Sequence, residues 1–207
     1  MLYVFEGPDS IGKSTVSAAF AERLRRAGTS QPVRHWSFPG RDEGTLGWAV
    51  YRLHHKPQDL GVAALTPTSL QVLHIAAHVD AIESRILPAL DAGEIVVLDR
   101  FWWSTFVYGV VGGVPVEVLD AMIAVERRAW RSVVPMVAFL VDRHEPFRLR
   151  DDERIDDWCR LREEYGRLAE REARVHRVLR VANDGPITAA VDAVEAEYRS
   201  RSAERLN

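Results

Sequence analysis

The stretch that most constrains the fold lies within the first fifteen residues and reads Gly7-Pro8-Asp9-Ser10-Ile11-Gly12-Lys13-Ser14-Thr15. It matches G-x-x-x-x-G-K-[ST], with an apolar strand pattern before it (residues 2–5) and a helical pattern after it (residues 16–24). In such a unit the two glycines let successive backbone N–H groups point at an anion, and the helix N-terminus adds partial positive charge. The stretch therefore predicts a cradle for the phosphates of a nucleotide triphosphate.

Within this cradle two side chains have specific expected roles. Lys13 should reach the β- and γ-phosphates, and the hydroxyl of Ser14 should ligate Mg²⁺. Only Lys13 and Lys56 are lysines among 27 basic residues. A chain that otherwise uses arginine therefore has a lysine at position 13, where a compact charge on a flexible side chain suits the phosphates. The residues expected to contact the triphosphate are Gly7, Ser10, Ile11, Gly12, Lys13, Ser14 and Thr15.

Bulk properties narrow the class of protein. A chain of 207 residues, 47% of them apolar, suits a single domain spanning residues 1–207. The net charge of −3 gives no support to a nucleic-acid partner. No signal peptide is recognised before the first strand pattern, and the longest apolar stretch, residues 133–141, is too short to cross a membrane. With Cys159 as the single cysteine, we expect a cytoplasmic protein with no membrane partner.

Strand and helix patterns alternate along the whole chain. The predicted strands are residues 2–5, 33–38, 94–99, 134–141 and 178–181. The predicted helices are residues 16–24, 46–53, 66–88 (with Pro88 kinking or ending it), 104–109, 116–130, 158–175 and 186–200. Residues 142–158 are charged without a clear period and read as a mobile loop. This alternation predicts an α/β fold, with about five parallel strands and helices on both faces of the sheet.

Charged residues stand where two predicted strands end. Asp99 is the last residue of the third predicted strand, and open parallel sheets bind ligands at this carboxyl edge. Asp99 could hold Mg²⁺ there, directly or through water, or it could fix the side chain of Arg100. Arg100 and Arg41 both follow strands, and their paired N–H donors suit a monophosphate. Surface salt bridges are the alternative for either arginine alone.

Taken together, these stretches resemble the thymidylate kinase family of nucleoside monophosphate kinases. Residues 5–15 are similar to its phosphate loop, including an acidic residue, Asp9, inside the loop. Residues 38–41 and residues 76–93 are similar to the segment after the second strand and to the helix before the third. Residues 99–104, followed by Tyr108, resemble the D-R-[YH]-x-x-S motif, and residues 152–156 match the lid more weakly. The resemblance implies a P-loop kinase fold with a lid at about residues 143–157, and phosphoryl transfer from ATP to a nucleoside monophosphate.

The resemblance also implies roles for particular residues. It implies that the catalytic residues are Lys13, Asp99, Arg100 and Arg154. No general base is expected, because a phosphate acceptor is already ionised near neutral pH. Some family members carry a basic residue inside the phosphate loop; Ser10 is neutral there, so the lid should supply Arg154, with Arg150 as the second candidate near the ATP phosphates. A solvated run of charge is the alternative for each lid arginine. Asp9 is expected near the sugar hydroxyl, and the acceptor site comprises Asp9, Phe38, Arg41, His74, His78, Arg100 and Tyr108.

Two histidines depart from the family pattern. In typical members a phenylalanine stacks on thymine and an arginine four residues later hydrogen-bonds its edge; these positions hold His74 and His78. Imidazole can stack and can donate or accept a hydrogen bond, but it lacks the arginine fork. Three interpretations stay open: a base pocket retuned to another pyrimidine, a modified base or a purine; two ordinary, partly buried histidines; and a metal pair, which lacks a third ligand in the pattern.

Two other functions compete with a monophosphate kinase. A deoxynucleoside kinase would phosphorylate a neutral hydroxyl and would need a carboxylate base near the second strand, where Glu43 is the only glutamate. The chain could also be a nucleotide switch or a catalytically silent nucleotide-binding protein, although no N-K-x-D guanine motif appears. Because members of the family are commonly homodimers, the resemblance also implies a homodimer.

Overall fold

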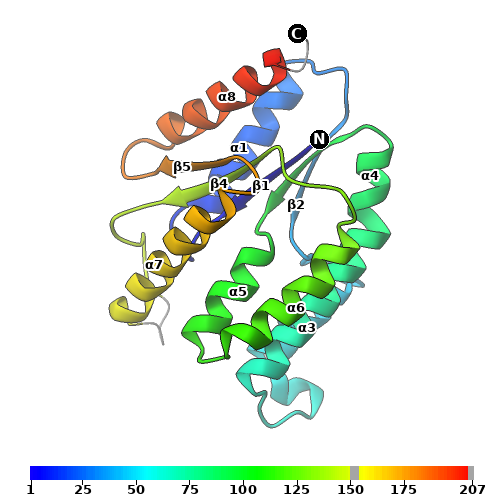
Figure 1. Ribbon diagram of the computed structural model, residues 1–207, viewed down its shortest axis with the longest axis vertical. Helices are drawn as coiled ribbons and strands as arrows, with labels where there is room; N and C mark the ends of the chain where they lie inside the picture. The colour runs from blue at the N-terminus through cyan, green and yellow to red at the C-terminus, as the bar shows by residue number, and fades with distance from the viewer. Residues whose placement is uncertain (150–153, 205–207) are drawn as a thin grey trace.

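The computed structural model describes residues 1–149 and 154–204, the last three of these by their backbone alone. Its centre is one sheet of five parallel strands in the order β2-β3-β1-β4-β5 (Figure 1). The register places Phe5 beside both Asp99 and Phe139, so three central strands end at the same edge. The strands are β1 (Leu2–Glu6), β2 (Val33–Ser37), β3 (Ile95–Asp99), β4 (Val137–Asp142) and β5 (Val178–Ala182).

Helices cover both faces of this sheet, which confirms the predicted α/β fold (Figure 1). Alternate residues of β1 face opposite sides: Tyr3 and Phe5 pack under α1 (Lys13–Arg26) and α8 (Ile187–Glu204). Leu2 and Val4 belong to the other apolar cluster. The helices contributing to that second cluster are α3 (Pro67–Ala81), η2 (Ile82–Ile86), α4 (Leu87–Asp91), α5 (Trp102–Val111), α6 (Val116–Ala129) and α7 (Ile155–Glu172).

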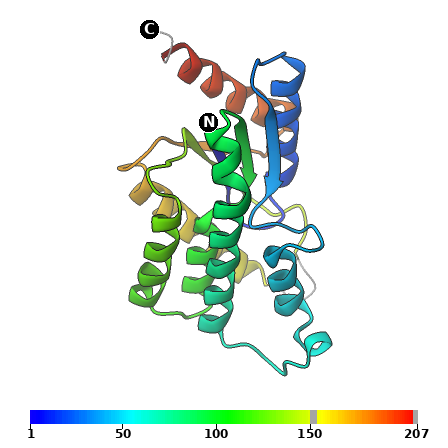
Figure 2. The same ribbon diagram turned by 90° about the vertical axis from the view of Figure 1, so that its right-hand side faces the viewer.

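The remaining helices form a projection beside α3. These are α2 (Leu46–His55) and the short 3₁₀ helix η1 (Pro57–Leu60), and α2 packs along α3 (Figure 2). The side chain of Thr45 caps α2 by accepting a hydrogen bond from the N–H of Trp48, and Thr66 caps α3 in the same way. Together they hold a pair of helices over the carboxyl edge of β2 and β3, where a ligand of a parallel sheet binds.

Several boundaries differ from the sequence-based ones. β4 begins at Val137, two residues after Pro135, since a proline cannot donate to the ladder. The helix predicted over residues 158–175 occupies residues 155–172, so α7 begins within the predicted loop. The long helix continues past Pro88 as far as Asp91, because a π turn over residues 82–86 precedes the proline and accommodates its missing N–H. Among the helices that the structure describes, none is long and apolar enough to cross a membrane.

Candidate active site

The predicted phosphate cradle lies between β1 and α1. Gly7 and Gly12 have φ of 136° and 82°, in the region that favours glycine. A Cβ on Gly7 would stand 2.5 Å from the carbonyl oxygen of Val141, and one on Gly12 would stand 2.5 Å from Nδ2 of Asn183. Gly12 is also the N-cap of α1, and no side chain caps that helix end. The first turn of α1 therefore opens onto the loop, as an anion site requires.

Lys13 is a buried cation beside this loop. Its side chain is 5% exposed and its Nζ donates only a long hydrogen bond, 3.4 Å, to the carbonyl of Pro8. Burial, reinforced by the nearby Arg100 guanidinium, lowers the pKa of Lys13 to about 8, although neighbouring carboxylates oppose the shift. Among the described residues, no carboxylate forms an ion pair with Lys13. The amine is thus placed to take an anionic ligand.

Arg100 follows β3 and faces the same loop. Its φ is 81°, and its backbone N–H donates to the carbonyl of Phe5 at 2.9 Å. The guanidinium donates to the carboxylate of Asp9 through Nη2 and to Oγ of Ser104 through Nη1, the latter at 2.9 Å. Burial alone would lower the pKa of Arg100, and the charge of Asp9 reverses this and holds the pKa well above its usual range. Arg100 is therefore a partly buried, anchored cation at the site, and not the surface salt bridge that was the alternative.

Ser104 connects Arg100 to Glu6, the residue that directly precedes the phosphate loop. One oxygen of Glu6 accepts from the N–H groups of Phe101 and Ser104, at 2.7 and 3.0 Å, and the other accepts from Oγ of Ser104 at 2.8 Å. Tyr165 on α7 donates its hydroxyl proton to the same Oγ at 2.9 Å. Burial raises the pKa of Glu6 to about 6. Sequence reasoning missed these anchors, although a glutamate inside an apolar strand was a usable signal for Glu6.

The predicted acceptor residues meet around one pocket that is open to solvent. All seven line it: Asp9, Phe38, Arg41, His74, His78, Arg100 and Tyr108. The guanidinium of Arg41 lies 5.4 Å from the ring centroid of Tyr51. Further lining residues come from α2 and α3 and were not predicted, because no motif marks them: Tyr51, His54, His55 and Gln71.

The two histidines that depart from the family pattern have different environments. His78 is 3% exposed, its Nδ1 lies 2.6 Å from Oε2 of Glu126, and its ring centroid is 4.3 Å from that of Phe38. His74 is less enclosed, and burial, helped by His78 and His54, lowers its pKa to about 3, so its ring is neutral at physiological pH. Glu126 is 48 residues from His78 and escaped prediction. Within the described part of the chain, no three His, Cys, Asp or Glu side chains group as a metal site.

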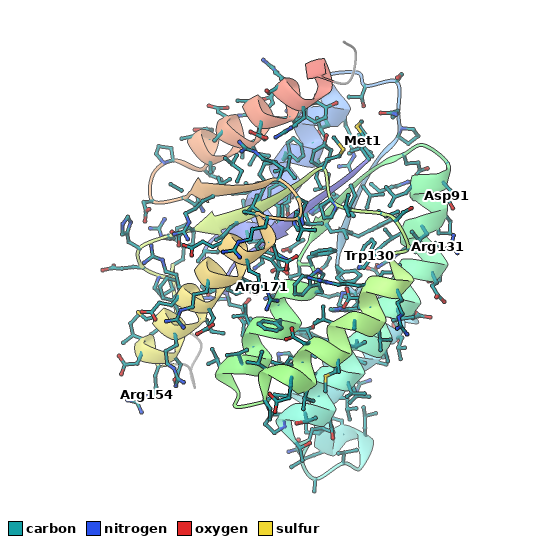
Figure 3. The ribbon with its side chains drawn as sticks, viewed as in Figure 1. Met1, Asp91, Trp130, Arg131, Arg154 and Arg171 are labelled. Atoms are coloured by element: carbon teal, nitrogen blue, oxygen red, sulfur yellow. The ribbon has the colours of Figure 1, made fainter. Side chains whose placement is uncertain are left out.

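The beginning of the predicted lid segment lies against the phosphate loop. The N–H of Phe147 donates to the carbonyl of Ser10 at 2.7 Å, and the guanidinium of Arg143 stacks on the Phe147 ring at 4.0 Å. Arg154 lies at the outer end of α7, with its side chain 77% exposed and 3.5 Å from Asp156 (Figure 3). The structure thus does not bring Arg154 to the pocket, and Arg150 lies outside the described residues.

Asp99 and Glu43 can be compared as carboxylates near the site. Asp99 is 5% exposed, and its Oδ1 is buried without a hydrogen-bond partner among the described residues. Glu43 is exposed and does not line the pocket. The pocket is lined by a single carboxylate, Asp9, within the described residues, and Asp9 is bound to Arg100. A base for a neutral hydroxyl is therefore not where the nucleoside kinase alternative needs it.

Comparison with known proteins gives the family. A thymidylate kinase family model matches residues 5–179. A probable thymidylate kinase of Natronomonas pharaonis is 30% identical over 94% of this chain and 97% of that protein, and a thymidylate kinase of Pelotomaculum thermopropionicum is 34% identical over 67% of this chain and 60% of that one. The crystal structure of a thymidylate kinase from Ehrlichia chaffeensis shares the fold, with a TM-score of 0.75 at 24% identity over 95% of this chain and 97% of its own. The chain belongs to the thymidylate kinase family and is a phosphotransferase that phosphorylates a nucleoside monophosphate with ATP.

Proposed function

We propose that residues 7–15 hold the triphosphate of ATP, that the adjoining pocket holds the acceptor nucleotide, and that the acceptor is dTMP, as the names of the relatives suggest. The observation that carries this proposal is the position of Arg100. Its guanidinium lines the pocket while its charge acts on buried Lys13 of the phosphate loop. Two anions, one in each compartment, would therefore meet between these two cations.

In this proposal the acceptor phosphate binds at the end of the pocket formed by Arg41 and Arg100. Arg100 is preorganised, because Asp9 and Ser104 already fix its guanidinium. Arg41 is exposed and rests on Tyr51, so it can move onto the phosphate with little loss of contacts. Asp9 lines the same pocket beside Arg100, where the sugar hydroxyl is expected, and the ring of Phe38 borders the base together with Tyr108.

The basic residues of the site would contribute to catalysis by neutralising charge and by aligning the two nucleotides. The reason is that the phosphoryl group passes through a loose transition state with charge spread over its oxygens. Lys13 would neutralise the β- and γ-phosphate oxygens, and Arg100 would neutralise the acceptor phosphate. Arg154, or Arg150 as the second candidate, would add charge when the lid segment covers the phosphates. No residue is assigned as general base, because the acceptor oxygen is already ionised.

The residues present also fit Mg²⁺. Asp99 offers a buried carboxylate oxygen without a donor, and Ser14 offers a hydroxyl in the first turn of α1. Oxygen ligands of this kind are the ones Mg²⁺ prefers, with water completing its shell. When bound, the ion would neutralise charge on the β- and γ-phosphates. Asp99 would hold it directly or through water.

We also propose the wider organisation that the family resemblance implies. Residues 1–207 would act as one kinase domain, with the lid at about residues 143–157, and two copies would form a homodimer. The free thiol of Cys159 fits a reducing compartment, which supports a cytoplasmic enzyme.

The test is ADP release from ATP and Mg²⁺ across deoxynucleosides and their monophosphates. We expect turnover with monophosphates only, and dTMP among the best. Arg41→Ala should raise KM for the monophosphate about tenfold or more, since a charge-assisted contact is worth about 1.5–3 kcal/mol. Arg128→Ala, an exposed arginine on α6 outside the pocket, is the matched control and should leave KM unchanged. Turnover of nucleosides but not monophosphates would reject the proposal.

A further inference from the structure

Three consecutive carbonyl groups of the phosphate loop accept hydrogen bonds from donors outside the loop. These carbonyls belong to Asp9, Ser10 and Ile11. Nε1 of Trp158 on α7 donates to the first at 2.9 Å, and Nδ2 of Asn183, which follows β5, donates to the third at 2.6 Å. The backbone N–H of Phe147, in the segment after β4, donates to the second at 2.7 Å. Three segments from different parts of the chain thus each hold one peptide group of the loop.

These contacts also fix the direction of the N–H groups in the same peptides. In a planar trans peptide the C=O and the following N–H point in opposite directions, so a carbonyl held against another segment turns the next N–H away from that segment. The N–H groups concerned belong to Ser10, Ile11 and Gly12. Among the described residues, none of these three donates to a protein acceptor. The loop therefore presents successive unused N–H groups, which is the arrangement that binds an anion.

The two side-chain donors are enclosed by the protein. Trp158 is 0% exposed and Asn183 is 2% exposed, so water cannot readily replace either donor. Burial of an indole does not by itself guarantee a partner in this protein, because Nε1 of Trp103, which is also 0% exposed, has none among the described residues. The contact between Trp158 and the loop is therefore more than a consequence of burying the ring.

We infer that Trp158 and Asn183 are positioning residues for phosphoryl transfer, whose side-chain N–H groups hold two carbonyls of the phosphate loop outward and so preorganise it for the triphosphate. This inference rests on the proposed function, because it concerns the site that residues 7–15 would form for ATP. Each side chain acts through a peptide group of the loop and is assigned no contact with the nucleotide. Donors that are already oriented need no rearrangement when charge develops on the phosphates, so the affinity for ATP and kcat should both depend on them.

A merely structural role predicts a different pattern. If the two hydrogen bonds only stabilised the fold, their loss would lower the melting temperature and the fraction of active enzyme, while the folded protein would bind ATP as before. If they position the loop, their loss weakens the binding of ATP and has a smaller effect on the acceptor, which binds in the adjoining pocket. The Kd for ATP and the KM for dTMP, measured on the same variants, separate the two roles.

The first variant is Trp158→Phe, which removes the donor and keeps a buried aromatic ring. It should raise the Kd for ATP about fivefold or more in titration calorimetry, because a buried carbonyl loses its partner. It should also lower kcat, while KM for dTMP should change by no more than about twofold. Trp103→Phe is the matched control, since the same volume is lost from a fully buried position without a hydrogen bond to lose. Its Kd for ATP should stay within about twofold of wild type.

The second variant is Asn183→Leu, which removes the other donor, keeps a side chain of similar size and adds no charge. It too should raise the Kd for ATP about fivefold or more. Inorganic triphosphate, used as a competitive inhibitor against ATP, probes the loop without the nucleoside. Its Ki should rise in both variants by about the same factor as the Kd for ATP. Melting curves establish that each variant is folded at the assay temperature, and Trp158→Phe decides alone if Asn183→Leu folds poorly.

The inference is wrong if Trp158→Phe binds ATP as tightly as wild type, or if Trp103→Phe weakens binding as much. It is also wrong if the Kd for ATP rises while the Ki of inorganic triphosphate does not, because the two side chains would then act on the nucleoside. Lys13→Met tests the proposed site separately. If this variant binds ATP and inorganic triphosphate as wild type does, residues 7–15 do not hold the triphosphate, and the inference is rejected together with that proposal.

Discussion

The phosphate loop and the base pocket are built in opposite ways. The loop is one run of nine residues whose backbone points at the ligand, with two glycines at positions that a Cβ would obstruct. The pocket takes its side chains from residues 9 to 108, and one of them, His78, contacts the buried side chain of Glu126 on a helix further along the chain. A site made of backbone can bind any triphosphate, whereas a site made of side chains can discriminate between bases. Variants of the loop should therefore lower activity with every acceptor, whereas variants of the pocket should change the preference between bases.

The largest expected effect lies in the phosphate loop. Lys13→Met should lower kcat at least about a hundredfold for every acceptor, because a preorganised charge at the transferring phosphoryl group is lost. The ranking of bases should not change. Since burial disfavours the charged amine, the variant should melt no lower than wild type at neutral pH. Lys56→Met, the exposed and only other lysine, is the control in steady-state kinetics and thermal melts.

If Lys13→Met altered base ranking, the two regions would not be separable in this way. A change of ranking would mean that the charge of Lys13 reaches the base through Arg100. A large drop in melting temperature would contradict the cost that we assign to burying the amine.

The second prediction uses pH to separate the regions. With the pKa of Lys13 near 8, the free enzyme loses this charge on the alkaline side, so the Kd for ATP should rise about tenfold between pH 7 and pH 9. Stability should move the other way: the unfolded chain binds more protons than the folded chain from about pH 8 to 10.5, so the free energy of unfolding rises with pH there. Titration calorimetry and melting curves measure both, and Lys13→Met should show neither trend.

The acceptor site gives the internal comparison for this pH series. His74 stays neutral throughout it, because its pKa of about 3 lies far below the range. Acceptor affinity need not follow the loss of the Lys13 charge. If the Kd for ATP rose equally between pH 7 and pH 9 in Lys13→Met, the titration would belong to another group.

The same contrast explains what could be predicted from the sequence. The loop, the strand ending at Asp99 and the arginine after it were readable because each is local: a motif, an apolar run and the residue that follows. The grouping of Phe38, His74 and Tyr108 in one pocket followed from the family resemblance. Glu126 and Tyr165 were not predictable, because each acts on a residue 48 or 61 positions away and no local pattern marks it.

Tyr165 supplies the third prediction, an effect shared by both regions. Its hydroxyl donates to Ser104, which in turn contacts Glu6 before the loop and Arg100 in the pocket. Tyr165→Phe removes one hydrogen bond of about 0.5–1.5 kcal/mol and should lower kcat/KM about two- to tenfold for all acceptors alike. Tyr198→Phe, on α8 at the opposite face of the sheet, controls for loss of a hydroxyl. A change in base ranking would place Tyr165 in base selection instead.

The smallest expected effect is at His74. Because burial holds its ring neutral, phenylalanine should replace it as a stacking face, and KM for the preferred acceptor should change by no more than about threefold with kcat unaffected. Its stability effect should appear only in acid. The pKa of His74 is lowered from 6.5 to about 3, so the unfolded chain binds more protons in that window and the folded state loses stability as pH falls. His74→Phe lacks this penalty, so its melting temperature should fall less between pH 7 and pH 5 than that of wild type, because the wild-type cost increases over about this range. A rise in KM of tenfold or more would show that His74 makes a polar contact with the base, and its assignment as a neutral stacking face would be wrong.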